Sequence, residues 1–87
     1  MDLDAKRFLE TIGTHIRQRR EAQGLTQAQL GERCELDRTF IGSVERGERN
    51  VSVLNLRKIA RSLRIPLIDL FVDLSAPPSD ETALSSE

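Results

Sequence analysis

The twenty residues 27–46, QAQLGERCELDRTFIGSVER, read as two short helices folded sharply against each other. Thr26, just before them, opens a capping-box pattern, and Asp37 is a good N-cap for a second helix that ends near Gly47. Helices joined by so short a turn must cross closely, and Gly31 keeps the crossing free of bulk. A helix presented in this way fits the major groove of DNA, where its side chains reach base edges.

A long helix is predicted before this unit. Phe8, Ile12 and Ile16 recur at intervals of four, which indicates a buried stripe on a helix from about Leu3 to Gln23. Gly24 is placed to end that helix. The three aromatic residues are all Phe, so the core must consist mainly of Ile, Leu and Val.

Two further helices are predicted after the unit. Ser52 is a good N-cap for a fourth helix, and Pro66 suits the first turn of a short fifth helix, Pro66–Asp73. The fourth helix is expected to bury Val53, Leu56, Ile59, Ala60 and Leu63. No strand-like alternation is present. The fold class is therefore all-α, with a compact five-helix domain over residues 1–74 and a disordered, Pro- and Ser-rich acidic tail over residues 75–87.

Composition narrows the functions. At 87 residues the chain is one domain, and its only cysteine, Cys34, excludes an internal disulfide framework and a cysteine metal cluster. No apolar run approaches the roughly 20 residues that span a bilayer, and the N-terminus lacks the apolar region of a signal peptide. We therefore expect a soluble cytoplasmic protein with no membrane partner.

The charge is strongly segregated. All 13 Lys and Arg residues fall between Lys6 and Arg64, and seven acids in the same span leave it at +6. The acidic ends restore the total of −1. A basic body of this kind is typical of a protein that binds phosphate groups, although the overall charge conceals it.

The pattern of the two-helix unit resembles the helix-turn-helix of the lambda repressor and Cro (XRE-like) family. The apolar positions Leu30, Cys34, Leu36, Ile41 and Val44 carry the resemblance, together with the small residue Gly31. Within that family, residues 36–56, LDRTFIGSVERGERNVSVLNL, are most similar to the controller proteins of restriction–modification systems. The resemblance covers roughly residues 12–71 and implies a lambda repressor-like DNA-binding domain.

Two positions depart from the family pattern. Glu35 stands at the turn where the family often has Gly, so we expect a non-Gly residue in a left-handed conformation. Gly42 lies inside the third helix, where it costs about 1 kcal/mol relative to Ala. Its lack of a side chain would allow a base or a backbone to approach closely.

The predicted base contacts lie mainly on the exposed face of the third helix. Arg38 is the first choice, because its guanidinium group can pair with guanine O6 and N7. Thr39 and Ser43 share that face, and the family resemblance supports all three positions. The resemblance to controller proteins also allows Arg49 to contact a base. The alternative interpretation is a polar face that is simply solvated.

Phosphate contacts need donors at helix N-termini and around the rim of the interface. The resemblance places Gln27 at a position that grips a phosphate and braces Arg38. The remaining candidates are Arg46, Asn50, Arg17 and Arg19. Any one of these arginines has an ordinary solvated charge as its alternative, so the prediction concerns the cluster.

The resemblance also implies a buried ion pair between Arg20 and Glu45, which would join the first and third helices. Such a pair is close to neutral for stability as a whole, whereas the loss of one partner costs about 3–5 kcal/mol.

A homodimer is expected, because one such unit reads too few base pairs for a specific address. The segment from Ile65 has more apolar residues than a short terminal helix needs. The predicted dimer interface consists of Leu54, Leu67, Leu70, Phe71 and Leu74. The alternative is that these residues close the monomer core, and we expect a mixture in which Ile68 and Phe71 point inward.

The predicted function is sequence-specific binding of double-stranded DNA by a homodimeric transcriptional regulator, acting on inverted repeats. The family resemblance implies a bacterial or phage protein that is associated with the nucleoid. It also implies control of restriction and modification genes, with RNA polymerase as a further partner. The alternatives are an antitoxin or phage-type repressor, or a protein-interaction module that does not bind DNA. No catalytic site, metal, cofactor or small-molecule ligand is expected. His15 lacks neighbours at ligand spacing, and the charges at residues 57, 58, 61 and 64 read as a solvated face.

Overall fold

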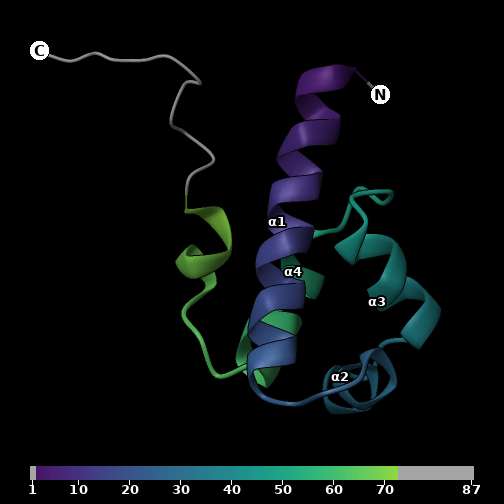
Figure 1. The fold of residues 1–87 in the computed structure, drawn as a ribbon, viewed down its shortest axis with the longest axis vertical. Coiled ribbons are helices and arrows are strands. Elements are labelled where there is room, and N and C mark those ends of the chain that lie inside the picture. Colours follow the sequence, from purple (N-terminus) through teal and green to yellow (C-terminus); the bar gives the residue numbers. More distant parts are fainter. Residues whose placement is uncertain (1, 73–87) are drawn as a thin grey trace, which may run out of the picture.

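A computed structural model describes residues 2–72, which form four α-helices and one 3₁₀ helix and contain no strand. The elements are α1 (Leu3–Ala22), α2 (Gln27–Cys34), α3 (Arg38–Glu45), α4 (Val53–Ser62) and η1 (Leu67–Phe71). In Figure 1, α1 runs along the longest axis, with α3 on one side and η1 on the other. The all-α class is confirmed, while the expected tail over residues 75–87 lies outside the described residues.

The predicted helix boundaries follow from side-chain caps. Thr26 and Gln29 form a reciprocal capping box at the start of α2, with bonds of 3.0 Å and 2.8 Å. Asp37 accepts from the backbone N–H of Thr39 at 2.8 Å, and Ser52 accepts from that of Asn55 at 3.1 Å. Each of these bonds satisfies a backbone donor that the first helical turn leaves free.

Left-handed residues end the first two helices. Gly24, with φ of +71°, follows the C-cap of α1 as predicted. Glu35 has φ of +59° at the end of α2, which confirms the expected left-handed turn at a non-Gly residue.

The last element differs from the prediction. Residues 67–71 form a 3₁₀ helix rather than an α-helix, and Pro66 precedes it in an extended conformation. The N–H of Asp69 donates to the carbonyl of Pro66 at 3.0 Å, as expected for a tight i to i+3 turn. The predicted short fifth helix is therefore present over residues 67–71, but it has the tighter 3₁₀ hydrogen-bonding pattern and begins after Pro66.

The burial of the η1 side chains differs from the prediction at two positions. In a 3₁₀ helix, residues three apart share a face, so Leu67 and Leu70 lie together towards the core. Leu70 is 0% exposed and offers no surface to a partner, which corrects its placement in the dimer interface. Ile68 is 71% exposed, so its predicted inward position is wrong. Phe71 packs partly against the core, and Leu74 lies outside the described residues.

One apolar cluster joins all five elements. Its fully buried members include Ile16 of α1, Leu30 of α2, Ile41 of α3 and Ile59 of α4. The whole cluster consists of Ile12, Ile16, Leu30, Cys34, Ile41, Val44, Leu56, Ile59, Ala60, Leu63 and Leu70. Burial of these side chains is the main driving force for folding, at roughly 1.5–3 kcal/mol for each large aliphatic residue. None of the described helices is long and apolar enough to cross a membrane.

Two residues expected in the core are exposed. Phe8 is 45% exposed, because the first turns of α1 extend beyond the neighbouring elements (Figure 1). Val53 is 66% exposed at the first position of α4, before that helix meets the core. Leu36 of the predicted buried set is partly buried and packs against the cluster.

Glycines permit the closest helix contacts. A Cβ atom at Gly13 of α1 would collide with the carbonyl oxygens of Val44 and Glu45 at the end of α3. A Cβ atom at Gly31 would collide with the carbonyl oxygen of Leu36, which confirms the predicted need for a small residue there. These contacts bring the end of α3 directly against α1.

We expect Gly13→Ala to lower the free energy of unfolding by about 1–3 kcal/mol, because the added methyl group must displace backbone atoms of α3. The intrinsic helix preference of Ala, about 1 kcal/mol, acts in the opposite direction and is smaller. Urea denaturation followed by circular dichroism measures the difference. Thr14→Ala, at an exposed neighbouring position, is the control. A Gly13→Ala variant as stable as the wild type would show that α1 and α3 do not pack this closely.

Candidate nucleic-acid interface

The exposed side of α3 forms a shallow hollow. Gln27, Arg38, Thr39, Gly42 and Arg46 line it. The Asp37 cap holds the first turn of α3, so that its first two residues are exposed at the rim. The structure therefore brings together four of the predicted contact residues with the glycine between them. We call this group of five residues the α3 hollow.

Gly42 leaves room for two neighbouring side chains. A Cβ atom there would lie 3.3 Å from Oε1 of Gln27 and 3.2 Å from Nη1 of Arg46. A larger residue would push both polar groups away from the helix. The structure thus gives Gly42 a definite role within the protein, whereas close approach by a base stays a prediction.

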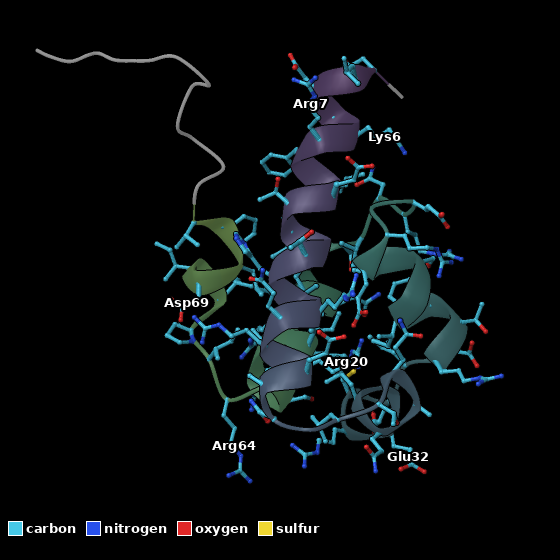
Figure 2. The ribbon with its side chains drawn as sticks, viewed as in Figure 1. Lys6, Arg7, Arg20, Glu32, Arg64 and Asp69 are labelled. Atoms are coloured by element: carbon cyan, nitrogen blue, oxygen red, sulfur yellow. The ribbon has the colours of Figure 1, made fainter. Side chains whose placement is uncertain are left out.

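The ion pair between Arg20 and Glu45 is present. Nε and Nη2 of Arg20 donate to the two carboxylate oxygens of Glu45 at 2.7 Å and 3.0 Å, and Nη1 donates to the carbonyl of Leu25 at 2.7 Å. The side chains of Arg20 and Glu45 are only 10% and 3% exposed. In Figure 2, Arg20 lies on the side of α1 that faces α3. The bond to Glu45 raises the pKa of Arg20, so the guanidinium stays charged.

Gln27 extends this pair to the interface. Its Nε2 donates to Oε1 of Glu45 at 3.0 Å, which ties the start of α2 to the end of α3. The remaining polar groups of the half-buried amide face the α3 hollow. The family resemblance implies that Gln27 braces Arg38, whereas in the structure the side chain of Gln27 is bonded to Glu45.

Arg49 is held above α3 by two contacts. Its Nε donates to the hydroxyl of Ser43 at 3.1 Å, and its Cζ lies 4.9 Å from the ring centroid of Phe40. The Ser43 hydroxyl donates in turn to the carbonyl of Phe40 at 2.8 Å. Ser43 is 8% exposed, so its surface for a base is small and its hydroxyl positions Arg49 instead. Phe40 is not among the predicted site residues, because a lone half-buried aromatic residue carries no spacing signal.

The predicted phosphate contacts differ in their surroundings: Arg46, Asn50 and Arg17 are exposed on the described surface, whereas Arg19 is bound to η1. Arg46 is exposed, and its Nε lies 3.0 Å from Glu48, whose pKa this bond lowers; Asn50 is also exposed. Arg17 forms an exposed pair with Glu21 at 3.3 Å. Arg19 instead pairs with Asp69 at 3.2 Å.

The pair between Arg19 and Asp69 links α1 to η1, which lies on the other side of α1 from α3 (Figures 1 and 2). The structure therefore does not gather Arg19 with the α3 hollow. His15 also joins α1 to η1, because its Nδ1 lies 3.1 Å from the carbonyl oxygen of Leu70. Among residues 2–72, no group of three His, Cys, Asp or Glu side chains is arranged to hold a metal ion.

Comparisons with known proteins agree with this geometry. Residues 16–70 match the helix-turn-helix family HTH_3. The chain is 45% identical over 56 residues to control protein C.MunI of a Mycoplasma species, covering 64% of this chain and 76% of that protein. It is 41% identical over 60 residues to control protein C.BamHI of Bacillus amyloliquefaciens, covering 68% and 74% of the two chains.

A solved structure shares the fold at similar identity. The restriction-modification controller protein C.AhdI from Aeromonas hydrophila superposes with a TM-score of 0.71 at 44% identity. The match covers 72% of this chain and 96% of that protein.

We expect Arg20→Ala to lower the free energy of unfolding by about 3–5 kcal/mol, because Glu45 would stay buried with Gln27 as its remaining side-chain donor. Arg17→Ala removes an exposed pair and should cost less than about 1 kcal/mol. Arg20→Lys keeps the charge without the forked geometry and should fall between them. Thermal denaturation measures all three, and an unchanged melting temperature for Arg20→Ala would contradict a structural role of the pair.

Proposed function

Because the chain belongs to the helix-turn-helix family HTH_3, we propose that it is a sequence-specific, DNA-binding transcriptional regulator. The observation that carries the proposal is the α3 hollow, where exposed arginine and threonine side chains flank a glycine beside the start of α2. The family is one of transcriptional regulators and control proteins rather than enzymes, so no reaction is assigned.

The first turn of α3 enters the major groove in this proposal. Arg38 and Thr39 are exposed there, and no carboxylate of the described residues lies within 4.0 Å of the Arg38 guanidinium. Arg38 can therefore pair with guanine O6 and N7 without first breaking an ion pair. Arg49 is a second base contact, because Phe40 and Ser43 restrict its side chain before DNA binds and reduce the entropy lost on binding.

Phosphate contacts position the domain on the duplex. The backbone N–H of Gln27 lies in the first turn of α2, where helix N-termini favour anions. Arg46 and Asn50 form the opposite rim, and Arg17 is the contact from α1. The exposed ion pairs of Arg46 with Glu48 and of Arg17 with Glu21 each stabilise the protein by at most about 1 kcal/mol. A DNA phosphate can therefore replace either carboxylate.

A homodimer on an inverted repeat completes the proposal. Dimers of such domains place two recognition helices about 34–36 Å apart, one turn of DNA. The apolar surface for the contact is exposed on α4, on η1 and at the residue that follows η1: Leu54 is 69% exposed, Ile68 is 71% exposed and Val72 is 47% exposed. Leu67 and Phe71 lie at its edge, half-buried against the core.

The relatives support a more specific biological role: two are named control proteins, and the similar solved structure is named a restriction-modification controller protein. We propose that this protein controls restriction and modification genes, including its own. Repression requires operator occupancy alone, whereas activation requires a contact with RNA polymerase.

DNA upstream of the protein's own gene is the test substrate, used in a gel-shift series against random duplex at moderate salt. A preferred site is the expected result. Equal affinity for both duplexes would overturn the proposal and favour a protein-interaction module. An upstream site that is bound without neighbouring restriction and modification genes would favour an antitoxin or phage-type repressor.

Arg38→Ala should reduce the free-energy preference for operator over random duplex by about 1–3 kcal/mol. Selection should be lost at the base pair that Arg38 contacts. Arg46→Ala should weaken both duplexes equally and reduce the slope of log affinity against log salt by about 1. Arg57→Ala, exposed on α4, removes the same charge outside the interface and is the control. Equal behaviour of the Arg38 and Arg46 variants would contradict this division between base and phosphate contacts.

Leu54→Lys and Ile68→Lys should each weaken the dimer about tenfold or more, because they place a charge in a desolvated apolar contact. Sedimentation equilibrium measures the dissociation constant. Leu3→Lys is the matched control, since Leu3 is 63% exposed in the first turn of α1, away from α4 and η1. Dimers of unchanged stability in both α4 and η1 variants would place the interface elsewhere.

A further inference from the structure

A second basic cluster lies where α2 and α4 end. Arg33 of α2, Lys58 and Arg61 of α4, and Arg64 just after α4 line a hollow of about 590 Å³. We call it the α2–α4 hollow. It shares no residue with the α3 hollow. Figure 2 shows Arg64 at the end of the molecule opposite the N-terminus of α1.

The four cations of the α2–α4 hollow have no carboxylate within 4.0 Å among the described residues. Three exposed arginines elsewhere, Arg17, Arg19 and Arg46, do have such a partner. Arg7, Arg38, Arg49 and Arg57 do not, so what marks the α2–α4 hollow is that its four cations lie together. The one acid that lines the hollow is Glu35, so positive charge predominates. Gathering unpaired like charges is unfavourable unless an anion offsets their repulsion. The C-terminal ends of two helices reduce that repulsion without removing it.

Two residues of this hollow have the left-handed backbone conformation in which glycine is the usual residue. Among the described residues, the non-glycine residues with positive φ are Glu35 and Arg64, and both line the hollow. Arg64 has φ of +60°, and the N–H of Ile65 donates back to Ala60 at 3.0 Å, as in a helix end that favours glycine at this position. Gly24 and Gly47 occupy the other left-handed positions. The Arg64 side chain is thus present at a conformational cost.

The buried residue Cys34 lies beneath the cations of the hollow and carries no negative charge that would repel an anion. Cys34 is 4% exposed, and its thiol donates to the carbonyl of Leu30 at 3.1 Å. Burial raises the pKa of the Cys34 thiol, so it remains neutral. Ser62 adds a hydroxyl donor at the wall. Guanidinium groups beside a hydroxyl are the donors that phosphate oxygens favour, because each guanidinium can donate two parallel hydrogen bonds.

We propose that the α2–α4 hollow binds a phosphate group, held by Arg33, Lys58, Arg61 and Arg64. The sequence alone predicts a solvated face for three of these residues, because it does not show that Arg33 of α2 joins them. The phosphate belongs either to a small phosphorylated molecule, for which the hollow is large enough, or to a DNA backbone outside the α3 contact. The proposal does not depend on which genes the protein regulates.

Titration of the ¹⁵N-labelled full chain with pyrophosphate tests the site. We expect saturable chemical-shift changes at the backbone amides of the α2–α4 hollow. The double variant Lys58→Gln with Arg61→Gln should bind pyrophosphate about tenfold or more weakly. Arg7→Gln with Arg57→Gln removes two exposed charges elsewhere and should bind as the wild type does. Equal weakening in both double variants would show general charge attraction and overturn the proposal.

Arg64→Gly separates binding from folding. It introduces the residue that the left-handed position favours, so the melting temperature should stay equal or rise while pyrophosphate binding weakens. Unchanged binding in a stable Arg64→Gly variant would remove Arg64 from the site.

Duplex DNA distinguishes the two sources of phosphate. If the hollow takes a DNA phosphate, Lys58→Gln with Arg61→Gln should reduce the salt slope of random-duplex binding by about 2 relative to the Arg7 and Arg57 control. If it takes a small molecule, the two double variants should share one salt slope, and pyrophosphate should still bind to the wild type. The proposal fails if neither pyrophosphate nor duplex perturbs the hollow. These experiments do not measure preference for an operator over random duplex. A negative result would therefore overturn the phosphate site and leave the proposed DNA-binding function untouched.

Discussion

Three N–H groups converge on the buried carboxylate of Glu45 and join the elements around α3. Two come from Arg20 of α1, and the third comes from Gln27 at the start of α2. A carboxylate removed from water is costly unless such donors are present together. An arrangement that separates α1, α2 and the end of α3 therefore loses apolar contacts and also leaves the Glu45 carboxylate without its donors. The same bonds reach the surface, because Gln27 also lines the α3 hollow. The Glu45 carboxylate, which holds the helices together, thus also restrains Gln27 at the α3 hollow.

This arrangement is possible only because the helices approach closely. Gly13 lets the end of α3 lie against α1, and Gly31 lets the turn after α2 fold back over that helix. Gly42 has a different role, since it makes space for the side chains of Gln27 and Arg46 on the outer side of α3. A glycine inside a helix is intrinsically unfavourable. Here the tertiary contacts that it permits outweigh that cost.

The sequence predicts the parts of the fold that depend on local chemistry. The caps at Thr26, Asp37 and Ser52 form as expected, because each needs only its own helical turn. Predictions that depend on neighbours far along the chain were less successful. Phe8 fits the helical period but lies beyond the elements that would cover it. Leu70 is buried in the core, which the apolar pattern of the last segment does not distinguish from a dimer contact. In the candidate interface, periodicity placed Ser43 on the outer face of α3. It could not show that Arg49 and Phe40 would occupy its surroundings.

The arginines show why position in space decides the interpretation of a charge. Arg19 is a candidate phosphate contact in the sequence, yet in the structure it pairs with Asp69 of η1. Lack of a partner does not by itself mark a site, since Arg7 and Arg57 also have no carboxylate within 4.0 Å among the described residues. What distinguishes the two basic clusters is convergence: side chains from different elements meet at one hollow, where their fields add and a single anion can contact several of them. A chain with a net charge of −1 can therefore present two cationic surfaces.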